Sequence, residues 1–124
     1  MKKLIFAIIL LMLILAAGIA EQIYLNNLFD ELEGRIDGII TAMEDGQEVS
    51  GQTKELSDWW GKKHRLIEAL VNHGEIKEIT LLVAEIQGYS EADMTPDLHA
   101  CVVRLLITAK HVRHLLEYRP EHIF

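Results

Sequence analysis

Residues 24–43 read YLNNLFDELEGRIDGIITAM, and the spacing of their apolar side chains decides the fold. At about 100° per residue, the large apolar residues fall within an arc of about 120°, as along a helix that buries one face. They are Leu25, Leu28, Phe29, Leu32, Ile36, Ile39, Ile40 and Met43. Gly34 and Gly38 lie on the opposite face, where they weaken the helix without interrupting this stripe. The stretch therefore predicts an amphipathic core helix.

An unbroken run of 17 apolar residues, Leu4 to Ala20, precedes this helix. As a helix it is about 26 Å long at ~1.5 Å per residue, close to the ~30 Å of a hydrocarbon core. Lys2 and Lys3 flank it, and basic residues of this kind keep an N-terminus on the cytoplasmic side of the membrane. The sequence therefore predicts a membrane segment at residues 4–20 and an outward-facing domain over residues 21–124.

Two fates are open for this leader. Gly18-Ile19-Ala20 resembles the small-x-small pattern before a signal-peptidase cut, which would release a secreted chain beginning at Glu21. Against cleavage, the run exceeds the ~7–15 apolar residues of a signal peptide, and no helix breaker follows Ala20. We favour an uncleaved anchor in the cytoplasmic membrane.

Three more helices follow the opening stretch. Residues 44–52 form a polar loop, and Thr53 or Ser50 can cap the next helix. The apolar arc of that helix contains Leu56, Trp59, Trp60, Leu66, Ile67, Leu70 and Val71. It is expected to end at Asn72-His73-Gly74, because Gly74 suits the left-handed position just past a helix end.

The third helix is expected from Glu75 to about Gly88. It presents Ile76, Ile79, Leu82, Val83 and Ile86 to the core. Thr95-Pro96-Asp97 then starts the last helix with a capping hydroxyl, a proline and an acid in the first turn. That helix packs Leu98, Cys101, Val102, Leu105, Ala109, Val112 and Leu116, and Pro120 ends it. The prediction is an all-α fold, in which an N-terminal transmembrane or signal helix leads a small antiparallel bundle of about four helices.

Charge and composition restrict the function. The chain has 12 basic and 19 acidic residues, and every acidic one follows Ala20. This balance excludes nucleic acid as a partner and disfavours docking onto anionic lipid. The single cysteine, Cys101, rules out an internal disulfide and is expected to be a small core residue. We expect no enzyme, no cofactor and no metal, because the sequence contains no nucleophile in a catalytic setting and no phosphate-binding loop.

Lys63 is the most unusual placement, because it falls near the middle of the apolar arc of the second helix. Its stem can lie along Trp59 and Trp60 while its ammonium reaches solvent or an acid. Alternatively, Lys63, the two indoles and His64 form a pocket for an anionic or aromatic ligand. His64 is expected to be a hydrogen-bonded residue at the rim of the arc.

A mixed strip lies on the outward face of the last helix. It consists of Val103, Ile107, His111, His114 and Tyr118. Three interpretations are open: cover by the loop or the first helix, a surface for a protein partner or a second copy of the chain, and a metal site. We take it as the candidate partner surface.

Residues 56–79, LSDWWGKKHRLIEALVNHGEIKEI, together with the leader and the Ile-Phe terminus, resemble an uncharacterised bacterial family catalogued as domain of unknown function 4363. The Trp60-x-x-x-His64 spacing and the Asn72-His73 pair carry the likeness. The resemblance implies an N-terminal transmembrane segment and an outward helical domain, with no assigned activity.

The function expected from these features is a non-catalytic, membrane-tethered module for protein interaction or structure at the outer face of the membrane. The alternative is an extracytoplasmic domain that binds a small ligand or senses pH through the Lys63 cluster. The physical basis for pH sensing is the six histidines, which gain positive charge in mild acid on an otherwise acidic domain.

Overall fold

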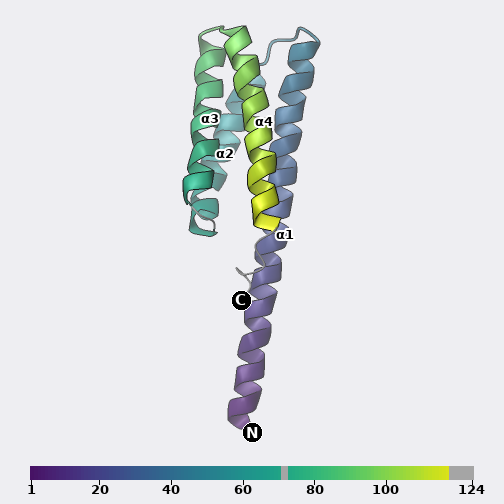
Figure 1. Cartoon of the computed structure of the whole chain (residues 1–124), viewed down its shortest axis with the longest axis vertical. Coiled ribbons are helices and arrows are strands. Elements are labelled where there is room, and N and C mark those ends of the chain that lie inside the picture. The colour runs from purple at the N-terminus through teal and green to yellow at the C-terminus, as the bar shows by residue number, and fades with distance from the viewer. Residues whose placement is uncertain (71–72, 118–124) are drawn as a thin grey trace.

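The structure is a computed structural model that describes residues 1–70 and 73–117. Within these residues it contains four helices and no strand (Figure 1). They are α1 (Lys2–Glu44), α2 (Ser50–Leu70), α3 (His73–Glu91) and α4 (Thr95–Glu117). The predicted all-α fold is confirmed.

The helices alternate in direction and form a ring in which α1 contacts α2 and α4, and α3 contacts α2 and α4. The N-terminal half of α1 projects beyond this bundle as a single rod (Figure 1). Its most apolar 18-residue window has a mean hydropathy of 2.8, and none of that window is buried. By length and composition, this part of α1 can span a membrane or act as a signal sequence. The expected domain boundary after Ala20 falls inside the helix.

The predicted core stripes of α1, α3 and α4 are confirmed. On α1, the apolar residues from Leu25 to Ile39 are buried, Ile40 and Met43 are partly buried, and Ala42 joins them. All five expected residues of α3 are buried. The six expected residues from Leu98 to Val112 on α4 are buried as well. The side chains of Leu70 and Leu116, and the whole of Val71, lie outside the described residues.

The predicted arc of α2 was too wide. Leu66 is 52% exposed, and Trp59 is only partly buried, whereas Leu56, Trp60 and Ile67 are at most 1% exposed. The reason is that α2 packs mainly against α3 and only lightly against α1, so it buries a narrow stripe. Thr53 lies on this stripe and is 1% exposed.

Several expected helix ends shift by a few residues. Because α2 begins at Ser50, Ser50 and Thr53 belong to its first turn, and the loop before it is shorter than predicted. Gly74 was expected to close α2, but it lies in the first turn of α3. The helix α3 continues past Gly88 to Glu91. The start of α4 at Thr95 is confirmed, but the Leu98 N–H donates to the Met94 carbonyl, so Met94 is the flanking residue.

Two helices end with the same hydrogen-bonded closure. After α1, the Gln47 N–H donates to the Ala42 carbonyl while Gly46 takes a φ of 73°. After α3, the Met94 N–H donates to the Tyr89 carbonyl while Asp93 takes a φ of 56°. Both are Schellman motifs, in which one left-handed residue allows the last carbonyls of the helix to be satisfied.

We predict that the adjacent substitutions Ile67→Ala and Leu66→Ala differ sharply in their effect on stability. Ile67 is fully buried, so its truncation leaves a cavity and lowers the free energy of unfolding by about 2–5 kcal/mol. Leu66 is exposed, and its truncation changes that energy by less than about 0.5 kcal/mol. Thermal unfolding of the full chain, followed by circular dichroism, measures both. Equal losses would contradict the narrow stripe on α2.

Candidate functional site

Trp60 connects α2 to α3 in the core. Its side chain is 1% exposed, and its indole Nε1–H donates to Thr80 Oγ1 at 2.9 Å. Thr80 Oγ1 in turn donates to the Ile76 carbonyl at 3.0 Å. The polar atom of Trp60 is therefore satisfied by α3, and the ring serves packing.

The other members of the predicted Lys63 pocket lie at the surface of α2. The ring centroids of Trp59 and Trp60 lie 6.2 Å apart. The Arg35 guanidinium lies 5.1 Å from the Trp59 ring centroid, within range of a cation–π contact. His64 Nδ1 lies 3.0 Å from the Gly61 carbonyl, as expected for a hydrogen-bonded rim residue. Lys63 is partly buried, and none of the described carboxylates lies within 4.0 Å of its ammonium. A ligand pocket at these four residues stays a prediction.

Three residues of the predicted partner surface on α4 are exposed. Ile107 is 63% exposed, and His111 and His114 also face solvent, whereas Val103 is partly buried. Neither the loop nor α1 covers Ile107. The interpretation that the loop or the first helix covers this strip is therefore excluded at Ile107. Among the described residues, no three His, Cys, Asp or Glu side chains are arranged to hold a metal ion. Tyr118 lies outside the described residues.

Arg113 joins α4 to α1 near the projecting leader. Its Nη1 donates to Glu33 Oε2 at 2.6 Å, and its Nη2 lies 2.7 Å from Asp30 Oδ1. The hydrogen bond to Glu33 is the main cause of a raised Arg113 pKa, and the bond to Asp30 adds to it. Asp30 and Glu33 are three residues apart, so α1 presents both carboxylates on one face. Sequence reasoning missed this cluster, because nothing in the local pattern pairs residues 80 positions apart.

Cys101 is a core residue, as its position in the stripe predicted. Its side chain is 3% exposed, with Sγ 3.7 Å from the Leu82 carbonyl and 3.6 Å from Glu85 Oε2. Burial, assisted by the nearby Glu85 carboxylate, raises the pKa of the thiol to about 11. Because thiolate is the reactive form, this raised pKa lowers the reactivity of the thiol near neutral pH.

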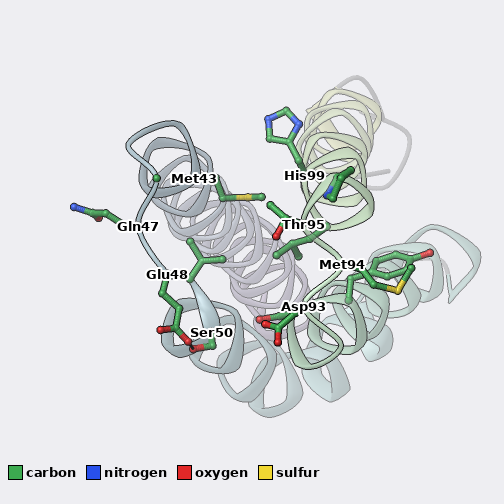
Figure 2. A pocket seen from close by; sticks show the side chains of 14 residues that line it. Met43, Gln47, Glu48, Ser50, Asp93, Met94, Thr95 and His99 are labelled. Atoms are coloured by element: carbon green, nitrogen blue, oxygen red, sulfur yellow. Dashed lines mark hydrogen bonds between the residues drawn. The ribbon is translucent and has the colours of Figure 1, made fainter.

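A cavity of about 700 Å³, the loop-end cavity, opens between the α1–α2 and α3–α4 connections (Figure 2). Both connections lie at the end of the bundle opposite the leader (Figure 1). The apolar lining of the cavity includes Met43, Val49, Tyr89, Met94 and Leu98. Asp93 and Thr95 also line it, whereas Figure 2 shows Gln47 and His99 pointing away. Sequence reasoning did not anticipate this cavity, because both connections looked like ordinary polar turns.

The Thr53 and Ser90 hydroxyls lie beside this cavity, 3.0 Å apart. Thr53 Oγ1 also donates to the Ser50 carbonyl at 3.0 Å. This pair fastens the start of α2 to the end of α3, so the two connections that frame the cavity are held in a fixed relation.

Comparison with known proteins gives one match. Residues 19–123 match the family model described as Domain of unknown function (DUF4363). No curated protein and no solved structure matches the chain.

We predict that removing the Glu33 charge destabilises the chain more than removing the Asp30 charge. Both carboxylates bind Arg113, but the Glu33 side chain is 17% exposed and the Asp30 side chain 65%. Glu33→Gln should lower the free energy of unfolding by about 1–2 kcal/mol. Asp30→Asn should lower it by about 0.5 kcal/mol or less, since exposed pairs are weak. Thermal unfolding at low and high salt measures both, and an equal or reversed order would show that the ion pairs do not fasten α4 to α1.

Proposed function

The chain belongs to the family described as a domain of unknown function (DUF4363), and we propose that it is a non-catalytic helical module tethered to the outer face of a bacterial cytoplasmic membrane. The observation that carries this proposal is the exposed apolar half of α1. The large apolar residues from Leu4 to Leu15 are 42–69% exposed. Burying a fully exposed side chain of this kind is worth about 1.5–3 kcal/mol, so covering these partly exposed ones with a bilayer removes part of that cost for each.

The helix also supports an anchor over a cleaved signal. Residues 18–20, the candidate cleavage site, lie within the continuous α1 helix. Proteolysis favours exposed loops over continuous helix, so this placement disfavours a cut after Ala20. Lys2 and Lys3 then hold the N-terminus inside and direct the bundle outward.

The bundle lies close to the membrane under this proposal. Only residues 21–24 separate the apolar run from Leu25, the first buried residue of the core. Four helical residues span about 6 Å, so no flexible stalk intervenes. The module is therefore held in one orientation relative to the bilayer, with its loop-end cavity facing away.

The proposed activity is binding of an envelope protein by the α4 surface of Val103, Ile107, His111, His114 and Tyr118. Its described part combines a large exposed apolar side chain with two exposed histidines on one face. Exposed apolar side chains that lie among polar groups are typical of protein interaction surfaces.

The topology is testable with a cysteine at Asp45, an exposed residue in the α1–α2 connection. We expect a membrane-impermeant maleimide to label Asp45→Cys in intact cells stripped of any outer barrier, and the uncut chain to sediment with membranes. The unsubstituted chain is the control, because its buried Cys101 should stay unlabelled until the chain is unfolded.

Two results would contradict this topology. Labelling of Asp45→Cys only after lysis would place the bundle inside the cell. A soluble product with the mass of a chain that begins at Glu21 would show that the leader is a cleaved signal.

The binding surface is testable with matched apolar substitutions. We expect the double substitution Ile107→Ser with His111→Ala to reduce co-purification of envelope partners by about fivefold or more, as loss of contacts worth about 1 kcal/mol or more implies. Leu81→Ser is the control, since Leu81 on α3 is 55% exposed and lies outside the proposed surface. Equal recovery by the two variants would place the partner surface elsewhere.

A further inference from the structure

Two segments of the chain carry acidic residues without any basic ones. Residues 36–53 contain four Asp or Glu residues and residues 78–103 contain five, and neither segment contains Lys or Arg. The α1–α2 connection lies in the first segment and the α3–α4 connection in the second. Both connections lie at the end of the bundle farthest from the leader (Figure 1). The fold therefore gathers unbalanced negative charge around the mouth of the loop-end cavity.

The cavity has an apolar base and a charged rim. Val49 is 6% exposed and Leu98 is 4% exposed, and Met43 and Tyr89 pack against the core beside them. The volume of about 700 Å³ lies in the range of small-molecule sites, about 300–1,000 Å³. An apolar base of this kind suits a ligand with an aromatic or branched hydrocarbon group.

Glu48 and Asp93 supply the charge at the rim, one from each connection. Ser50 Oγ donates to Glu48 Oε1 at 2.8 Å, and within the described part of the chain neither carboxylate has a Lys, Arg or His partner within 4.0 Å. The lining itself contains no Lys or Arg. Two helices begin and two end here, so their partial charges largely cancel and the carboxylates decide the sign.

Asp93 has a backbone conformation that is unusual for a residue other than glycine. It occupies the left-handed site of the α3 closure, where Gly46 stands in the matching closure of α1. Glycine adopts that conformation without strain, whereas aspartate does so less readily. The chain accepts this less favourable backbone position at a residue that places a carboxylate at the rim of the cavity (Figure 2).

We propose that the loop-end cavity binds a small organic cation, an amine or quaternary ammonium that carries one aromatic or branched apolar group. The apolar group lies against Val49 and Leu98, and the cationic nitrogen lies between Glu48 and Asp93. Tyr89 also lines the cavity, and its ring is a group that can contact a cation. An anion is repelled by both carboxylates, and a neutral analogue forgoes their attraction. This site does not depend on the proposed tether or on the α4 surface.

The four methionines make the proposal directly testable. Met43 and Met94 line the cavity, whereas Met1 and Met12 lie in or before the leader. In the full chain, ¹³C-methyl-labelled at methionine and held in zwitterionic nanodiscs, phenethylamine should shift the Met43 and Met94 signals saturably. The neutral analogue 2-phenylethanol should bind at least about two- to fivefold more weakly, since it cannot form ion pairs with the two exposed carboxylates.

Charge-removing variants test the carboxylates. Glu48→Gln and Asp93→Asn should each weaken phenethylamine binding by about two- to fivefold, with asparagine keeping the left-handed backbone. Asp45→Asn is the control, because Asp45 carries the same charge in the same connection but does not line the cavity. Its effect should be less than about twofold.

Three outcomes would overturn the proposal. Shifts confined to Met12 would show partition of the amine into the bilayer only. Equal affinity for phenethylamine and 2-phenylethanol would show an apolar cavity without charge selectivity. Equal weakening by Asp45→Asn and Asp93→Asn would show attraction to the whole acidic end and not to the two rim carboxylates.

Discussion

The structure depends on one helix that meets two different surroundings. Over residues 4–20, α1 is apolar on every side, and nothing in the bundle covers it. From Leu25 onward the same helix is apolar on one face only, and that face forms a wall of the core. The helix does not break between the two parts, so no flexible linker separates the leader from the bundle. The same helix, α1, therefore carries the exposed apolar leader and packs in the core of the bundle.

The end of α4 is attached to α1 by a cluster of ion pairs. The end of α4 returns to the point where α1 leaves the core, and there the Arg113 guanidinium binds Asp30 and Glu33. The contribution of this cluster rests mainly on the less exposed Glu33, since an exposed pair is screened by water. It joins α4, which carries the exposed surface, to α1. A partner bound to Ile107 would consequently meet the bundle at a set height above the leader.

Periodicity predicted most of the fold because three of the four helices bury a stripe as wide as the pattern implies. It failed on α2, where Leu66 continues the apolar arc but lies beyond the reach of α3. Angular position shows which residues share a face, but only the neighbouring helices decide how far the covered part extends. Thr53 illustrates the converse, since a polar residue expected at a cap is buried through its bonds to Ser50 and Ser90. The Arg113 cluster and the loop-end cavity were not predictable for a related reason: each joins residues that only the tertiary fold brings together.

Gly46 and Asp93 show how a local rule and a site can conflict. The same closure follows α1 and α3, and backbone sterics favour glycine at both left-handed positions. The chain follows that rule after α1 and departs from it after α3. Packing does not account for the difference, because Asp93 is exposed. A carboxylate in that position instead adds to a cavity lining that contains Glu48 and no Lys or Arg, which raises the electrostatic cost of the folded state. A cation in the proposed site would lower the electrostatic cost, whereas the backbone cost of Asp93 would stay the same, so a ligand offsets the charge and not the conformation.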